Sequence, residues 1–272
     1  MDHLRFKLQN RIFDFKMKFL KMYFGKKERL CPSKLYKDSS KIHLIYRISD
    51  AGYPKDKLSC INNENCLKNA VEAFPLSKVD WCIICDNCSE ETLAMIEKYI
   101  PKENMSIVSV GHGAGTFNLA LDKALTFDDD DIVYFLENDY LHTENSLEVL
   151  IDGFKLTNGE NDYITLYDHP DKYDVNHPIY YYMKKRTHVF LGEKSHWKTA
   201  FSTTMTFAAK VVTLKDDEKI WRQWTTTRHP FDFKIFTTLG KKGKSLLSPI
   251  PGCSTHGEKA FLGPLVDWEN LA

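Results

Sequence analysis

The sequence lacks the features that would place it in several large classes of protein. No apolar run reaches the roughly 18 residues that a membrane-spanning helix needs, and no segment resembles a cleavable signal peptide. There is no net charge, because 37 Lys and Arg residues balance 37 Asp and Glu residues. A protein that binds nucleic acid by neutralising many phosphates is therefore not expected. Internal repeats and long low-complexity linkers are also missing, so the sequence does not require a second independent domain.

The cysteines are odd in number. Five of the seven cysteines lie between Cys60 and Cys88. A disulfide framework is not expected in a chain with enough apolar sequence for a large core, so we interpret these residues as reduced thiols of a cytoplasmic protein. With 43% hydrophobic and 27% charged residues, the 272-residue chain has the composition of a globular domain.

Residues 1–40 form a basic amphipathic segment that differs from the rest of the chain. Residues 1–30 contain nine Lys and Arg residues against three Asp and Glu residues, and aromatic and aliphatic residues are interleaved with them. Two interpretations stay open. The segment either lies peripherally on an anionic membrane surface, or forms a terminal helix that packs on its own domain or on a partner subunit.

From residue 41 onward, apolar strands alternate with helices. This alternation predicts an α/β fold with a mostly parallel sheet flanked by helices, and ligands bind such sheets beyond the carboxyl ends of the strands. We expect residues 41–272 to form one domain. The expected strands are Ile42–Tyr46, Asp80–Cys85, Ser106–Val110 and Asp131–Leu136, and the expected helices are 62–74, 89–99 and 116–125.

Two carboxylates follow the last of these strands. Glu137 and Asp139 are two positions apart, and alternate residues of a strand share a face, so both side chains are expected to point the same way. Oxygen ligands of this kind suit Mg²⁺ or Mn²⁺, which commonly take one or two carboxylates plus substrate phosphates. From the residues alone, a solvated exit from the strand remains the alternative to a metal site.

Three further segments carry polar residues in patterns that allow two interpretations. Glycines from Gly111 to Gly115 precede a helix, which suits either a tight turn or the approach of an anion to the helix N-terminus. Asp232, in the segment Arg228–Phe236, could cap a helix. The cluster of Asp168, His169, Asp171, Asp174 and His177 could hold a metal ion or form a polar loop over a second substrate.

Glu137-Asn138-Asp139 resembles the DxD signature of nucleotide-sugar-dependent glycosyltransferases of the GT-A fold, with Glu in the first position. The apolar strand before it and Tyr140 after it are similar to that family's context. The order of elements from residue 41 is closest to the inverting, family-2-like group. The resemblance implies a Rossmann-like sheet with a C-terminal acceptor-binding portion. It also implies a Mn²⁺ or Mg²⁺ ion held by Asp139, with Glu137 as the second acid.

Other positions match this family in the right order. Asp232 stands where the family has its catalytic base, although Phe231 replaces the usual preceding Glu; a base is needed because an acceptor hydroxyl is a poor nucleophile at neutral pH. His256 resembles a late His that completes the metal or diphosphate site. The positions that the resemblance places near the donor nucleotide are Arg47, Asp50, Asp86, Gly113, Gly115, Asn118, Glu137 and Asn138.

The sequence therefore predicts an inverting glycosyltransferase with a nucleotide-diphosphate sugar donor. Its acceptor is expected to be a glycan, a lipid-linked sugar or a polysaccharide. The donor-binding half is expected at 41–140 and the acceptor-binding half at 141–272, with an acceptor pocket from Tyr163 to Trp224. A sugar-phosphate nucleotidyltransferase is the alternative enzyme, although the segment after the first strand, Arg47 to Gly52, is not glycine-rich. A catalytically degenerate module that binds nucleotide sugars is the alternative without turnover.

Overall fold

The computed structural model describes residues 37–51, 55–156, 162–176 and 187–271. These residues belong to one compact unit of the chain, Ser33–Ala272. The basic amphipathic segment expected at 1–40 lies almost wholly outside the described residues, as does His177. Within the described ranges, no helix has both the length and the apolar character needed to cross a bilayer, and the six cysteines there are free thiols.

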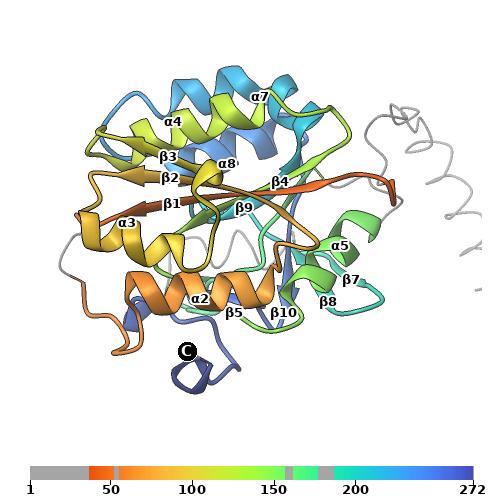
Figure 1. Cartoon of the computed structure of the whole chain (residues 1–272). Helices are drawn as coiled ribbons and strands as arrows, with labels where there is room; N and C mark the ends of the chain where they lie inside the picture. The colour runs from red at the N-terminus through yellow and green to blue at the C-terminus, as the bar shows by residue number, and fades with distance from the viewer. Residues whose placement is uncertain (1–36, 52–54, 157–161, 177–186, 272) are drawn as a thin grey trace, which may run out of the picture. The chain divides into compact units, whose positions relative to one another are not determined.

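The predicted α/β fold with a mostly parallel sheet is confirmed (Figure 1). The sheet has nine strands in the order β3-β2-β1-β4-β9-β6-β10-β8-β7. The four strands expected from the sequence pair in parallel at one side of it, with β1 between β2 and β4. Their bounds are β1 Ile42–Ser49, β2 Asp80–Asp86, β3 Met105–Val108 and β4 Ile132–Glu137.

The other side of the sheet comes from the second half of the chain, where no strands were predicted. Strand β9 runs antiparallel to both β4 and β6, and β10 pairs in parallel with β6 and antiparallel with β8. Most of these strands are short, which gives little sequence periodicity to detect. Their bounds are β6 Tyr163–Ile164, β7 Val189–Leu191, β8 His196–Thr199, β9 Phe207–Lys210 and β10 Leu246–Ile250.

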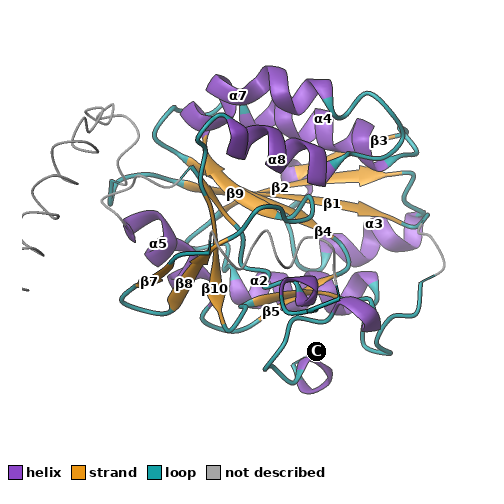
Figure 2. Cartoon of the chain, turned by 180° about the vertical axis from the view of Figure 1, so that it is seen from behind, coloured by secondary structure: helices purple, strands orange, loops and turns teal. Residues whose placement is uncertain are grey.

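Helices cover both faces of the sheet, as Figures 1 and 2 show. One face carries α4, α7 and α8, and the other carries α2, α3 and α5. The helix starts follow local capping rules, because Asn62 and Ser89 accept the backbone N–H groups of Asn65 and Thr92 at 2.9 and 3.2 Å. The bounds are α2 Asn63–Ala73, α3 Glu90–Glu97, α4 Gly113–Ala124, α5 Ser146–Lys155, α7 Val211–Gln223 and α8 Asp232–Lys241.

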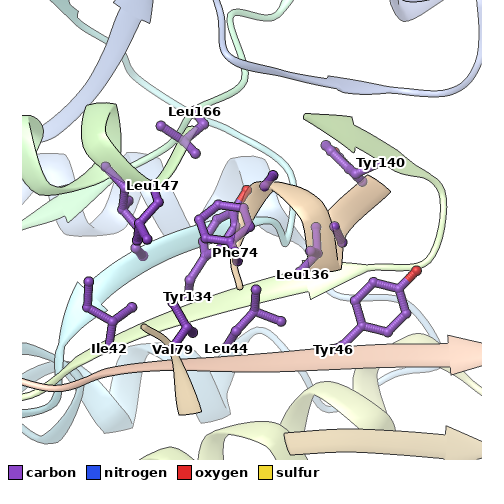
Figure 3. Close-up of a cluster of buried hydrophobic side chains, with 14 of the residues drawn as sticks. Ile42, Leu44, Tyr46, Phe74, Val79, Tyr134, Leu136, Tyr140, Leu147 and Leu166 are labelled. Carbon is purple, nitrogen blue, oxygen red and sulfur yellow. The ribbon is translucent and has the colours of Figure 1, made fainter. Parts of the chain in front are cut away.

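Each layer of helices packs on its own apolar core. Figure 3 shows part of the first core, in which Phe74, Tyr134 and Leu147 meet between the sheet and the α2 side. The second core, on the α4 side, centres on stacked rings of Phe207 and Trp221 whose centroids are 4.7 Å apart. Burial on both faces explains why the central strand β4 reads as a continuous apolar run.

The carboxyl ends of β1, β2 and β4 lie level with one another. In the register of the sheet, Arg47 of β1 is opposite Glu137 of β4, and Ser49 of β1 is opposite Asp86 of β2. Beyond this edge, β5 (Tyr140–His142) and β11 (Ser254–His256) form a separate two-stranded antiparallel sheet. The polar residues singled out by sequence therefore gather at one edge, where open α/β sheets bind ligands.

Candidate active site

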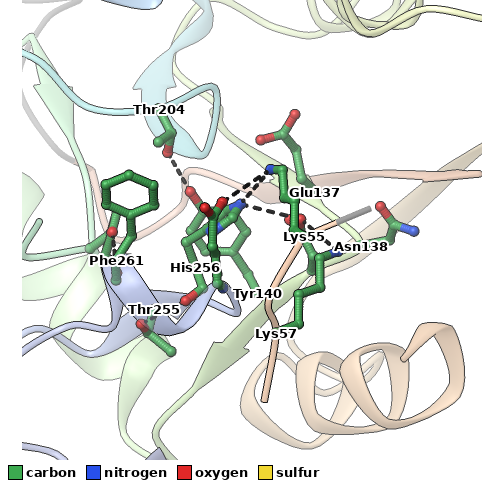
Figure 4. Close-up of polar contacts among 12 residues, drawn as sticks. Lys55, Lys57, Glu137, Asn138, Tyr140, Thr204, Thr255, His256 and Phe261 are labelled. Carbon is green, nitrogen blue, oxygen red and sulfur yellow. Dashed lines mark hydrogen bonds and ion pairs between the residues drawn. The ribbon is translucent and has the colours of Figure 1, made fainter. Parts of the chain in front are cut away.

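Glu137 and Asp139 do not lie on one strand. The expectation of a shared face is wrong because β4 ends at Glu137, and Asn138 and Asp139 form a turn between β4 and β5. The Glu137 carboxylate accepts from Arg47 Nη2 at 3.0 Å. Figure 4 shows Glu137 outside the network of dashed contacts. The two acids that the sequence groups as metal ligands therefore have different partners in the structure.

Arg47 is a buried cation that organises this edge of the sheet. Its side chain is 5% exposed, and its Nη1 donates to the carbonyl oxygen of Gly113 at 3.2 Å and to Thr116 Oγ1 at 3.4 Å. Together with Glu137, these contacts tie the end of β4 to the first turn of α4. The placement of Arg47 beside the donor nucleotide, which the resemblance implies, stays a prediction.

Asp139 and His256 do come together, as the resemblance implies. His256 Nε2 lies 3.2 Å from Asp139 Oδ2, although the two residues are far apart in sequence. Pairing of β11 with β5 places His256 opposite Tyr140, the residue after Asp139. Burial alone would raise the pKa of Asp139, but the hydrogen bond and charge of His256, with the charges of Lys57 and Lys55, hold that pKa well below its usual range. Asp139 is therefore ionised at neutral pH.

Two lysines that sequence reasoning missed complete this group. Lys57 Nζ lies 3.1 Å from Asp139 Oδ2, and Lys55 Nζ lies 3.3 Å from His256 Nε2 (Figure 4). Lysines two positions apart in an extended segment share a face. This spacing after the first strand could have indicated a basic pair.

The Asp139–His256 pair offers two donor atoms to a divalent cation. Two donor atoms 3.2 Å apart suit neighbouring ligands of one ion at about 2.1 Å each. The ammonium groups of Lys55 and Lys57 already place positive charge against these atoms. Nδ1 of His256 accepts the backbone N–H of Glu258 at 3.2 Å, which leaves the ring proton on Nε2, so Asp139 is the readier ligand. Among the described residues, no group of three or more His, Cys, Asp or Glu side chains could hold a metal.

Three other predicted donor-site residues are engaged in hydrogen bonds at the strand ends. The buried Asp86 carboxylate accepts the backbone N–H groups of Val110 and Gly111 at 2.6 and 2.9 Å. Asn138 donates to Asn63 Oδ1 at 2.6 Å. Asn63 in turn donates to Asp50 at 3.2 Å. Burial would raise the pKa of Asp50, but hydrogen bonds from Thr92 and Ser89 lower it overall.

Gly113 and Gly115 lie within the first turn of α4, and Gly111 precedes the helix. The helix was expected to begin at Thr116, but it begins at Gly113 because His112 caps it, Nδ1 accepting the N–H of Gly115 at 3.0 Å. A Cβ at Gly115 would lie 2.3 Å from Val110, so this position requires glycine. Asn118, one turn later, exchanges hydrogen bonds with Thr225 beyond α7.

Asp232 is the first residue of α8, and the N-cap position belongs to Phe231, which makes no side-chain cap bond. The Asp232 carboxylate accepts the adjacent N–H of Phe233 at 2.6 Å. Burial raises the pKa of Asp232 and outweighs the hydrogen bond from Phe233, which lowers that pKa; the charge of Glu137 raises it further, and His169 and Lys172 lower it by smaller amounts. Asp232 thus shares an electrostatic environment with the acid at the end of β4, although the two residues belong to different elements.

The acid and histidine cluster after β6 forms ion pairs. Asp168 Oδ1 lies 2.6 Å from the buried Lys198 Nζ, and Asp171 contacts His169 at 2.8 Å and Lys172 at 3.4 Å. These pairs satisfy carboxylates that would otherwise be costly to bury. Asp168 and Asp171 are therefore paired with lysines of the chain itself, and Asp174 accepts the backbone N–H of Asn176 at 2.8 Å.

Comparison with protein families gives one match of substantial length. The sequence model described as glycosyl transferase family 2 matches residues 59–220, which is more than half of the 272-residue chain. The matched region contains the Glu137-Asn138-Asp139 turn and ends before Asp232 and His256. No curated protein matches the sequence.

Several solved structures resemble this chain in fold. GalNAc-T7 with UDP, GalNAc and Mn²⁺ superimposes with a TM-score of 0.52 at 10% identity, covering 80% of this chain and 44% of that chain. TarS 1–349 of S. aureus gives 0.46 at 16% identity, covering 81% and 59%. A CMP:2-keto-3-deoxy-manno-octonic acid synthetase with CTP gives 0.44 at 11% identity, covering 77% and 89%. This chain thus spans less than half of GalNAc-T7, and that likeness supports the fold alone.

Proposed function

This chain belongs to glycosyl transferase family 2 and is a glycosyltransferase, and we propose that it transfers a sugar from a nucleotide-diphosphate donor to an acceptor hydroxyl with inversion. The observation that carries the proposal is the Asp139–His256 pair at the carboxyl edge of the sheet, with Asp232 electrostatically coupled to the same edge. The Asp139–His256 pair can act on the leaving group, and Asp232 can act on the nucleophile. Residues 41–140 would bind the donor and 141–272 the acceptor.

Asp139 would hold the divalent cation, and His256 would join it after its ring gives up the Glu258 amide. A bound cation would neutralise the charge that develops on the diphosphate leaving group. Mixed oxygen and nitrogen ligands favour Mn²⁺ over Mg²⁺, which prefers oxygen ligands throughout. The main role of Glu137 would be to hold Arg47 against α4. Binding the cation would be a lesser role.

Asp232 would take the proton of the acceptor hydroxyl as the oxygen attacks the anomeric carbon. A carboxylate with a raised pKa is a stronger base than an ordinary carboxylate. The hydrogen bond from Phe233 would hold one oxygen and leave the other for the acceptor. Attack from the face opposite the leaving group gives the inverted product.

The nucleoside would bind beside the ends of β1 and β2. Asp86 and Asp50, with Asn138, set the shape of this region through the hydrogen bonds described above, and Gly113, Gly115 and Asn118 set the start of α4. Arg47 would add positive potential from beneath the donor. The acceptor would be a glycan, a lipid-linked sugar or a polysaccharide, bound by the region from Tyr163 to Trp224.

A panel of nucleotide sugars tests this function. We expect one donor to raise the melting temperature in Mn²⁺ but not in EDTA, and to be hydrolysed slowly when no acceptor is present. Release of pyrophosphate from a nucleoside triphosphate and a sugar phosphate would instead identify a nucleotidyltransferase. Donor binding with neither hydrolysis nor transfer would identify a degenerate binding module.

The N-terminal segment supports a proposal about location, which is a cytoplasmic enzyme held peripherally at a membrane. Deleting residues 1–30 removes an excess of six positive charges, each contributing about 1 kcal/mol near an anionic surface. We therefore expect co-sedimentation with anionic liposomes to fall by about two orders of magnitude or more, with activity on a soluble acceptor retained. Zwitterionic liposomes are the control. Unfolding of the truncated protein would show instead that the segment packs on the domain.

A further inference from the structure

Two ammonium groups lie against the Asp139–His256 pair. Lys57 Nζ contacts Asp139 Oδ2 at 3.1 Å, and Lys55 Nζ lies 3.3 Å from His256 Nε2 and 3.7 Å from Glu258 Oε2. Figure 4 shows both lysines converging on the pair from one chain segment. Both side chains remain partly exposed, at 34% for Lys55 and 28% for Lys57, so their ammonium groups can move.

Backbone hydrogen bonds fix the position of the segment that carries Lys55 and Lys57. Leu58 N donates to the carbonyl oxygen of Gly257 at 3.1 Å, and Lys259 N donates to that of Asp56 at 2.8 Å. Gly257 N donates to the carbonyl oxygen of Asp139 at 2.8 Å. The lysine segment, the His256 segment and the Asp139 turn are therefore one hydrogen-bonded unit. These backbone hydrogen bonds therefore hold the two lysines close to the Asp139–His256 pair.

A divalent cation and the two lysines cannot occupy the pair together. A cation bound between Asp139 Oδ2 and His256 Nε2 would take the oxygen that Lys57 contacts and the nitrogen that Lys55 approaches, and like charges at such distances repel. The displaced ammonium groups would remain within a side-chain length of the cation. The other ligands of that cation would be diphosphate oxygens, and lysine is a frequent phosphate-binding residue.

We propose that Lys55 and Lys57 bind the diphosphate of the donor after a divalent cation has displaced them from His256 and Asp139. The proposal rests on the proposed function, since it needs a nucleotide-diphosphate donor and a cation at Asp139. In the cation-free protein the ammonium groups of Lys57 and Lys55 balance the carboxylates of Asp139 and Glu258. In the loaded protein the same two residues supply positive charge to the leaving group.

Methionine substitutions test this role, because methionine keeps the aliphatic stem and removes the charge. Lys57→Met should bind Mn²⁺ more tightly than the wild type, by about fivefold or more, because a competing cation is gone. Free Mn²⁺ can be followed by electron paramagnetic resonance. In saturating Mn²⁺, both Lys55→Met and Lys57→Met should bind a nucleoside diphosphate about tenfold or more weakly, the value of one charged hydrogen bond. UDP, GDP, CDP and ADP are titrated first, and the one that binds the wild type is used.

Lys68→Met is the matched control, since Lys68 is a 59% exposed lysine of α2 that pairs with Glu72. Opposite changes in Mn²⁺ and nucleotide affinity would support the proposal. Nucleotide affinities equal to that of the control would overturn it, even if the wild type binds Mn²⁺ and nucleotide as expected. A weaker nucleotide affinity of both variants in EDTA, with no change in Mn²⁺ affinity, would overturn the displacement step. A wild type that binds none of the four nucleotides would overturn the proposed function itself.

Discussion

Asp232→Asn should lower the rate of sugar transfer by about 10²–10⁴-fold while donor affinity stays nearly unchanged. This is the usual contribution of a general base, and asparagine cannot accept the proton of the acceptor hydroxyl. The substitution keeps an oxygen for the N–H of Phe233. Because the pKa of Asp232 is raised, the fold disfavours its ionised form at neutral pH, so the neutral amide should not destabilise the protein.

The pH profile gives a second measurement for the same residue. The base must be ionised, so the transfer rate of the wild type should fall as the pH drops through the pKa of Asp232, which lies above the ordinary carboxylate value. Asp232→Asn should lose this acidic limb. Glu90→Gln, at the first position of α3, is the matched control. Normal turnover of Asp232→Asn would leave Asp232 as a structural residue of the α8 start, and a retained anomeric configuration would exclude direct displacement.

Asp139→Ala should abolish the dependence of donor binding on a divalent cation. The transfer rate should fall on the order of 10³-fold or more, because metal stabilisation of the leaving group amounts to several kcal/mol. Titration calorimetry of the donor in Mn²⁺ and in EDTA measures the effect directly. For the wild type the two affinities should differ, and for the variant they should be equal.

The melting temperature provides a control for the Asp139→Ala substitution. The pKa of Asp139 is lowered in the fold, so its ionised form contributes stability that is present above its unfolded pKa and lost as the pH falls through the folded pKa. Asp139→Ala should therefore melt at a lower temperature at neutral pH, and Asp139→Asn should be milder. Asp56→Asn is the control variant, because it removes a nearby carboxylate that is 78% exposed and pairs with Lys259. Equal donor affinities of the wild type in Mn²⁺ and EDTA would remove the metal from this mechanism.

The alternation of strands and helices in the first half of the domain could be predicted from sequence. Strand β4 is an uninterrupted apolar run because it is buried on both faces, and Asn62 and Ser89 cap the helices that they were expected to begin. These features depend on neighbours within a few residues, which periodicity and capping rules describe. The later strands are short and pair across long separations, so their periodicity carries little information.

The sequence by itself determined the fold class, the edge of the sheet where the polar residues gather, and the family to which the turn at Glu137-Asn138-Asp139 belongs. Only the tertiary structure decided the partners of those residues. Arg47 forms an ion pair with Glu137 because the parallel register of β1 and β4 places the two residues opposite each other. His256, with Lys55 and Lys57, reaches Asp139 because β11 pairs with β5 and residues 56–58 are hydrogen-bonded beside it. Such contacts depend on strand register and on side-chain direction between distant segments, which local sequence patterns do not encode.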